Sequence, residues 1–382
     1  MRSTLNVPRA ALLLAAASLP AAALLAQGAE PAPKPEAAIR VKDITVTAAE
    51  TRRTVEDLAQ KLQDIYVFPD VAKRYAAMLR ANAASGAYDN ISSGGALAER
   101  LSVDLNAVSA DRHLRVNLRE PEPPVQNAAV SSAPPRPVYP WKPVEEVRWL
   151  APGIAYIRFN VFPGDEETVA AVKAFMTEHA GAKTIIFDNR THHGGGLDEM
   201  NAMFPYLFAK PATLVTMDTR ASNFDGTDGP GLRRVAGPEG IVRHEHFVVP
   251  STTEKRLFNA KVFVLTSPRT GSAAEHMTLA LKHTHRATIV GETTAGAGHY
   301  GGVRPVGDHF EVFIPEGRTF DPDTGKDWEA VGIDPDVAVP ADQALTEALI
   351  LSGVDRAEAE RINATVKPSG PMTRRVRKPA TT

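Results

Sequence analysis

A proline-rich stretch divides this chain into two parts with different sequence patterns. Residues 120–140, EPEPPVQNAAVSSAPPRPVYP, show neither the period of a helix nor that of a strand. Proline fixes its own φ and has no N–H to donate, so such a stretch joins folded parts without belonging to either. We therefore predict a connector over residues 119–143, between a domain at residues 45–118 and a second domain at residues 144–353.

The first part has the pattern of amphipathic helices. In TVEDLAQKLQDIYVF, apolar side chains recur every three or four residues, at Val55, Leu58 and Leu62 among others. The same spacing returns in the segments around Leu79 and Leu101. The pattern predicts a small helical bundle.

The second part alternates between strand and helix patterns. Apolar runs such as IAYIRFNV, KTIIFD, KVFVLT and ATIVGE are separated by amphipathic segments. Alternation of this kind is typical of an α/β fold, in which helices cover a sheet. We expect an α/β core with an N-terminal helical bundle domain before it.

The two ends of the chain differ from these domains. Residues 1–29 begin with basic side chains, continue as an uncharged apolar run and end in small residues, which is the order of a secretory signal peptide. Residues 30–44 resemble a linker, and residues 354–382 form a basic tail. Because Pro20 interrupts a run already short for a membrane span, we expect cleavage of this leader and no stable membrane insertion afterwards.

The composition excludes several kinds of chemistry and partner. The chain has no cysteine, so disulfides, thiolate catalysis and cysteine–zinc sites are excluded. A formal net charge of -2 gives no electrostatic reason to bind nucleic acid. With the leader, this composition predicts a periplasmic or secreted protein.

The stretch TGSAAEHMTLALK carries the first candidate catalytic residue, Ser272, at a predicted strand-to-helix turn. Ser followed by Glu275 three residues later is the signature of a helix capping box. The same turn would also expose a nucleophilic hydroxyl beside the Ala273 amide and the positive end of the helix dipole. The motif is compatible with both interpretations.

A run of glycines follows another predicted strand, in FDNRTHHGGG. Ligand-binding loops of α/β folds lie at the carboxyl ends of strands, and glycine lets backbone amides approach a ligand. Acyl transfer requires two donors for the developing oxyanion. Ala273 with Gly194 or Gly195 could supply them.

Several motifs, taken in order, resemble the family of tail-specific (C-terminal processing) serine peptidases, which includes the tricorn core protease and the repeats of interphotoreceptor retinoid-binding protein. The resemblance rests on VFVLTSPRTGSAAEHMTLALK, RATIVGETTAGAG and WEAVGIDPDVAV, and on IIFDNRTHHGGG where the family has Asp-x-Arg-x-Asn-x-Gly-Gly. LAQKLQDIYVFPDVA and DLNAVSADRHLRV resemble the N-terminal domain of the retinoid-binding branch. It implies a ClpP/crotonase-like ββα superhelix core and a peptidase that needs no cofactor.

The resemblance implies that Ser272 is the nucleophile, but the lysine that serves as base in the tail-specific branch is absent. The tail-specific branch takes its base from a lysine in Gly-Glu-Lys-Thr-x-Gly-Lys-Gly, and here GETTAGAG has Ala297 at that position. The tricorn-like branch instead uses a histidine of the helical part, which matches His113, and a carboxylate, which matches Glu329. A triad of these side chains is chemically consistent, because a carboxylate can orient an imidazole that titrates near neutrality.

Other assignments stay open at this point. His299 follows the glutamate–threonine stretch and is an alternative base, and Glu292 or Asp111 could replace Glu329 as the carboxylate. His113 could equally be a surface residue at a helix end. If His113 and His299 both lie far from Ser272, a binding protein is favoured over an enzyme.

The remaining histidines give only a weak metal signal. His244 and His246 share one face of a predicted strand, and His192 and His193 replace the family's Asn and Pro before the glycines. Neither pair belongs to a HExxH or cysteine–histidine pattern, so no metal is expected.

These observations predict an exported serine endopeptidase that cleaves unfolded or damaged proteins and peptides through an acyl-enzyme on Ser272. The alternative is a non-catalytic protein that binds apolar ligands on the same scaffold, as in the retinoid-binding branch. Convergence of Ser272, both candidate histidines (His113 and His299) and the glycine loop would favour the enzyme.

Overall fold

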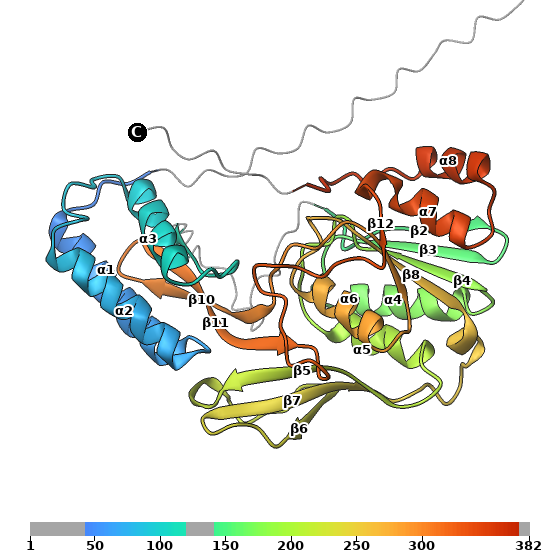
Figure 1. Ribbon diagram of the computed structural model, residues 1–382, viewed down its shortest axis with the longest axis horizontal. Coiled ribbons are helices and arrows are strands. Elements are labelled where there is room, and N and C mark those ends of the chain that lie inside the picture. Colours follow the sequence, from blue (N-terminus) through green and yellow to red (C-terminus); the bar gives the residue numbers. More distant parts are fainter. Residues whose placement is uncertain (1–42, 120–140, 374–382) are drawn as a thin grey trace, which may run out of the picture. The chain divides into compact units, whose positions relative to one another are not determined.

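The computed structural model describes residues 43–119 and 141–373 (Figure 1). The predicted signal peptide and most of both predicted linkers lie outside these residues. Within them, no helix combines the length and the apolar character that a membrane span requires.

The N-terminal region consists of three helices: α1 (Ala48–Ile65), α2 (Pro69–Ala84) and α3 (Gly94–Val108). Thr47 caps α1 through a capping box with Glu50, and a proline at the first position starts α2. The apolar faces predicted from the 3.6-residue period meet in one core, which includes Val55, Leu58 and Leu79.

A largely parallel sheet forms the centre of the second region. Its strand order is β12-β9-β8-β4-β3-β2, and only β2 is antiparallel to its neighbour. The strands are β2 (Val144–Ala151), β3 (Ile154–Phe159), β4 (Thr184–Asp188), β8 (Lys261–Thr266), β9 (Thr288–Gly291) and β12 (Val337–Ala338).

Helices cover both faces of this sheet, as Figure 1 shows. On one face, Ile185 and Val264 pack into a core with α4 (Glu166–Glu178), α5 (Asp198–Met203) and α6 (Ala273–His283). On the other face, Ile186 and Leu265 pack against α7 (Ala344–Leu351) and α8 (Arg356–Thr365). The short helix η1 (Phe204–Tyr206) extends α5. The predicted α/β core with N-terminal helices is therefore confirmed.

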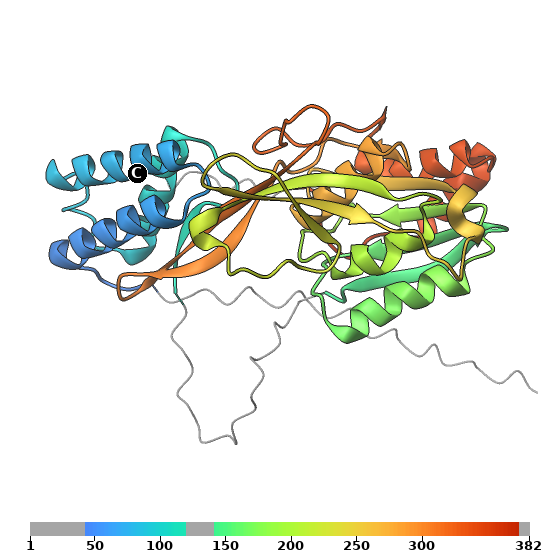
Figure 2. The same cartoon turned by 90° about the horizontal axis from the view of Figure 1, so that it is seen from below.

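A second sheet connects the helical region to the core. It contains β1 (Arg115–Leu118), β5 (Ala212–Arg220), β6 (Leu232–Val235), β7 (Ile241–Val248), β10 (His299–Val306) and β11 (Phe310–Phe320). The first half of β11 pairs with β1, and its last residues pair with β5. The orange strands β10 and β11, labelled in Figure 1 and seen from below in Figure 2, run from the helical region toward the core.

The structure differs from the sequence prediction at two places. The predicted tail at residues 354–382 begins too early, because α8 occupies its first part and buries Ala359 and Ile362. These side chains lie three residues apart and form one apolar helix face. Strands β1, β6 and β10 were not predicted, because exposed and polar side chains break their apolar pattern.

Candidate active site

Three neighbouring parallel strands bring three loops to one edge of the central sheet. β4 leads into the glycine loop at residues 189–196, β8 into the turn that carries Ser272, and β9 into residues 292–298. Carboxyl ends of parallel strands meet at the same edge, which is where α/β folds bind ligands.

The glycine loop and the Ser272 turn are joined by hydrogen bonds. The Ser267 hydroxyl donates to the Arg190 carbonyl oxygen at 2.6 Å, and the Thr270 hydroxyl donates to the Asn189 carbonyl oxygen at 2.8 Å. The Gly271 amide donates to the His192 carbonyl oxygen at 3.1 Å. These bonds set the glycine loop beside the residue before Ser272.

Ser272 has a backbone conformation that a helix cap does not require. Its φ is 54° and its ψ is -121°, whereas an N-cap serine normally has extended φ and ψ. A non-glycine residue with positive φ is strained, and such strain concentrates at functional sites. Ser272 does begin α6 and is half-buried, so it is both a helix terminus and a strained turn residue.

Glycine is required opposite Ser272 for two reasons. Gly194 and Gly195 have φ values of 126° and 130°, which L-residues rarely adopt. A Cβ atom on Gly194 would lie 2.8 Å from Ser272 Cβ and 3.3 Å from its Oγ, so this glycine and the serine face each other. A Cβ atom on Gly195 would lie 1.9 Å from the Phe162 carbonyl oxygen.

The three predicted oxyanion donors are not equivalent. The Gly194 amide donates to His192 Nδ1 at 3.1 Å. Within residues 43–119 and 141–373, no hydrogen-bond acceptor contacts the amide of Gly195 or that of Ala273. The amides of Gly195 and Ala273 are therefore available to a ligand, whereas the Gly194 amide is already engaged by His192.

His192 is a fully buried neutral imidazole. Burial keeps its pKa well below the ordinary value, and its ring lies edge-on to Phe162, with centroids 4.2 Å apart. Because Nδ1 accepts the Gly194 amide, the ring proton resides on Nε2. No sequence signal distinguished this role from a plain loop residue.

A single loop links Ser272 to the N-terminal region through two carboxylates. Glu275 accepts the amides of Gly296 and Ala297, at 2.6 and 2.8 Å. Glu329 accepts the next two amides, those of Gly298 at 2.7 Å and His299 at 3.1 Å. Four consecutive amides of the loop are therefore divided between two glutamates.

Glu329 also reaches the turn that carries His113. Its other oxygen accepts the Arg112 amide at 2.6 Å. One side-chain nitrogen of His113, one oxygen of Glu329 and one oxygen of Asp111 all lie within 4.8 Å of one another. The His113 ring stacks on Phe313, with centroids 5.0 Å apart. The structure thus brings the predicted base and the predicted carboxylate together.

His299, the alternative base, belongs to a different set of contacts. Its Nδ1 lies 2.7 Å from Asp111 Oδ2, and its ring contacts Phe68 of the helical region. Burial opposes its charge, but the hydrogen bond to Asp111 and the nearby Asp327 and Glu329 carboxylates raise its pKa to about 9. His299 is therefore a cation at neutral pH.

Among the residues that the structure describes, two groups of side chains have ligand atoms close enough to hold a metal ion: Asp111, His113 and Glu329, and separately His283, Asp321 and Asp323. In the first group, protein amides already bind Asp111 and Glu329. His244 and His246, which share one face of strand β7, contact different partners. His244 contacts Asp228 at 2.7 Å, and His246 contacts His276 at 2.8 Å.

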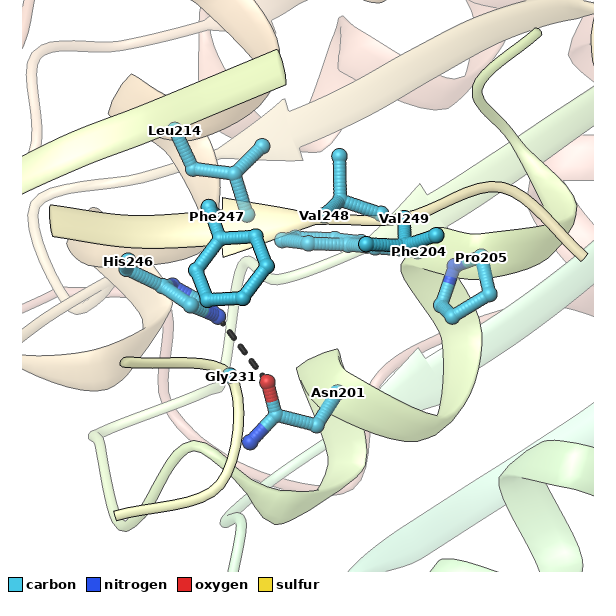
Figure 3. Close-up of a pocket in the computed structure, with 9 residues that line it drawn as sticks. All are labelled: Asn201, Phe204, Pro205, Leu214, Gly231, His246, Phe247, Val248 and Val249. Atoms are coloured by element: carbon cyan, nitrogen blue, oxygen red, sulfur yellow. Dashed lines mark hydrogen bonds between the residues drawn. The ribbon is translucent and has the colours of Figure 1, made fainter. Parts of the chain in front are cut away.

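His246 lines a separate pocket of about 220 Å³, whose lining residues are shown in Figure 3. The dashed line in the figure is the 3.0 Å contact between His246 Nε2 and Asn201 Oδ1. Burial lowers the pKa of His246 to about 4, so this ring is neutral at neutral pH. Phe204, Leu214 and Val248 make the walls largely apolar.

The sequence also matches known families. Residues 153–339 match the profile described as Peptidase family S41, and residues 36–149 match that of the N-terminal domain of this peptidase in eukaryotic IRBP. Together the two matched segments extend over most of the chain.

Solved structures with the same fold are distant in sequence. The photosystem II D1 C-terminal processing protease is 18% identical with a TM-score of 0.50, over 82% of this chain and 100% of its own. A peptidase from Parabacteroides merdae ATCC 43184 is 17% identical with a TM-score of 0.50, over 82% of this chain and 96% of its own. A lipoprotein from Streptococcus agalactiae is 13% identical with a TM-score of 0.50, over 80% of this chain and 97% of its own.

The profile matches and the shared fold agree with the motifs and with the strained serine that faces a glycine loop. The chain belongs to peptidase family S41, the tail-specific protease family, and is a serine peptidase.

Proposed function

We propose that this peptidase is exported and cleaves unfolded or damaged proteins through an acyl-enzyme on Ser272. The observation that carries the proposal is the Ser272 turn, strained at φ 54° and set against Gly194. Strain of this kind persists only where surrounding contacts hold it, and it commonly serves catalysis.

The reaction begins with attack of Ser272 Oγ on the carbonyl carbon of the scissile peptide bond. The hydroxyl proton passes to the base, and the amides of Gly195 and Ala273 stabilise the oxyanion. The tetrahedral intermediate then collapses as the base returns the proton to the leaving amine. Water, activated by the same base, hydrolyses the ester and restores the serine.

His113 is the base in this proposal, and Glu329 is its carboxylate. A general base must be unprotonated at the working pH. His299 meets this condition less well at neutral pH, since the hydrogen bond to Asp111 and the nearby carboxylates raise its pKa to about 9 and favour the protonated ring. His113 lies beside Glu329, whose oxygens also bind the loop that contacts the Ser272 turn.

Export is inferred from residues 1–29, which have the order of a signal peptide. The predicted connector at residues 119–143 is too short for an added peptide-binding domain of the PDZ type. We therefore expect selection of unfolded chains rather than of particular C-termini.

The test is degradation of an unfolded protein such as reduced casein by the wild-type chain and by Ser272→Ala, His113→Ala, His299→Gln and His309→Ala. His309 is an exposed histidine and serves as the matched control. We expect no turnover by the first two variants, at least partial activity of His299→Gln, and full activity of the control.

Loss of activity in His299→Gln with retention in His113→Ala would assign the base to His299. A folded wild-type chain that neither cleaves the substrate nor reacts with a fluorophosphonate would contradict the peptidase proposal. Saturable binding of an apolar fluorophore by that inactive chain would support the ligand-binding alternative.

A further inference from the structure

We propose that Glu275 is a positioning residue, which holds Ser272 and the loop at residues 294–297 in fixed relation through a buried carboxylate. The inference rests on the proposed function of Ser272. It assigns to Glu275 a role beyond that of a helix capping residue.

The Glu275 side chain is surrounded by hydrogen-bond donors from two loops. Its Oε2 accepts the Ser272 amide at 2.8 Å and the Ala297 amide at 2.8 Å. Its Oε1 accepts the Gly296 amide and the Thr294 hydroxyl, each at 2.6 Å. The residue is fully buried, so no water competes for these bonds.

Glu275 Oε2 limits the distance between the backbone nitrogens of Ser272 and Ala297, because it accepts both amides. Two amides that donate to one oxygen, each at 2.8 Å, have nitrogens no farther apart than twice that length. The nucleophile's own backbone is therefore held next to the backbone of Ala297. Ala297 stands where the resemblance places the family's lysine, so this loop acts here through its amides.

The fixed relation extends to the base. The amide that follows Ala297 is that of Gly298, which binds Glu329, and Glu329 also binds the Arg112 amide next to His113. Glu275 is thus the first link between the nucleophile and the turn that carries the base. Reacting groups displaced by about 1 Å can lose about 10²-fold in rate, so this link affects turnover directly.

The chemistry of the four donors explains why a carboxylate is needed. Burial raises the pKa of Glu275, and the hydrogen bonds oppose that rise. All four partners donate, and an ionised carboxylate only accepts. A glutamine has the same shape, but its NH₂ group must face two donors whichever way it is turned.

The test compares Glu275→Gln with Glu199→Gln in the full chain. Glu199 is equally buried, its pKa is also raised by burial, and it accepts one amide, that of Gly164 at 2.8 Å. For Glu275→Gln we expect kcat to fall about 10²-fold, KM to change less than about threefold, and fluorophosphonate labelling of Ser272 to slow in proportion to kcat. Thr294→Val removes one donor to the carboxylate, and also the acceptor of the Ile333 amide, but it keeps Glu275 ionised, so its kcat should fall less than that of Glu275→Gln.

A second measurement separates this inference from the proposed function. Hydrogen exchange at the amides of Ser272, Gly296 and Ala297 should accelerate in Glu275→Gln and stay unchanged in Glu199→Gln, whether or not the wild type cleaves any substrate. Failure of wild-type turnover alone contradicts the proposed function. Unchanged exchange, a kcat within about threefold of wild type, or an equal kcat loss in both glutamine variants would overturn the role of Glu275.

Discussion

Ser272 and Ala297 donate their backbone amides to the same oxygen of Glu275. Ala297 lies in the loop after β9, and Ser272 lies in the turn after its neighbour β8. The two loops are therefore in close contact at the position where the resemblance places the family's lysine. Backbone amides make this contact, and the Ala297 side chain is buried.

Gly195→Ala should abolish activity, because a Cβ atom would lie 1.9 Å from the Phe162 carbonyl oxygen and the loop must move. Gly226→Ala is the matched control, since Gly226 also has positive φ, 95°, and open space around its Cα. It should cost about 1 kcal/mol of strain and leave kcat unchanged. The measurements are turnover of casein and the melting temperature of both variants. Full activity of Gly195→Ala would show that the loop can move without consequence.

His192→Asn should keep most of the activity that His192→Leu loses. Asn Oδ1 stands as far from Cβ as His Nδ1 does, so it can accept the Gly194 amide at the same place. Leucine fills the space but leaves that buried amide without an acceptor, which costs about 1–3 kcal/mol and frees the loop. The kcat values and the rates of fluorophosphonate labelling measure the difference. Equal rates for the two variants would mean that the His192–Gly194 bond has no influence on the site.

His299 should make the stability of the protein fall at alkaline pH. Its pKa is raised to about 9, above the ~6.5 of an unfolded histidine, so the folded state binds the proton more tightly. The resulting stabilisation is complete below about pH 6.5 and disappears as the pH rises through about 9. Asp111, Asp327 and Glu329 face the ring, and carboxylates do not titrate in that window.

Urea unfolding at neutral pH and near pH 10 measures this effect. The free energy of unfolding of the wild type should fall by a few kcal/mol more than that of His299→Gln. His309→Gln, which changes an exposed histidine, should follow the wild type. An equal fall of the free energy of unfolding in the wild type and in His299→Gln would contradict the charged state of His299.

Asp188→Asn should destabilise the fold strongly. Asp188 is fully buried and binds the guanidinium groups of Arg158 and Arg190, at 3.1 and 2.7 Å. Removing its charge takes away the counter-ion that buried Arg190 has among the described residues, while Arg158 keeps Glu145 at 3.1 Å, and breaking a buried pair in this way typically costs about 3–5 kcal/mol. The urea midpoint should fall with an unchanged slope. Asp89→Asn, at an exposed ion pair with Arg52, should cost less than about 1 kcal/mol.

The sequence could predict the parts of the fold that have a strong period. Helices α1 to α3 and the buried strands β3, β4, β8 and β9 follow directly from their apolar spacing. Strands β6 and β10 pair with the strands that follow them, β7 and β11, but their own exposed and polar side chains give no apolar pattern that predicts a strand.

In the candidate site, too, some features could be predicted from the sequence and others could not. Ser272, the glycine loop, His113 and Glu329 stand in motifs, so they could be named from sequence and resemblance. His299 and Asp111 could be named as alternatives, but their pairing with each other and the Gly194–His192 bond could not be predicted, because both depend on side-chain rotamers and on which amide faces which ring. Glu275 was visible in the SAAE motif, but only the structure shows that it also binds the loop at residues 294–297.

The position of β11 in the chain has a consequence for synthesis. The core of the N-terminal helices includes Phe310, Val312 and Ile314 of that strand, and Asp57 accepts the Gly307 amide from 250 residues away. The core of helices α1 to α3 is therefore incomplete until β11, one of the last strands in the chain, has been synthesised. Contacts of such long sequence separation form slowly, so we expect this packing to be a late step of folding. A nascent chain of this protease cannot complete its active site until nearly all of the chain has been translated.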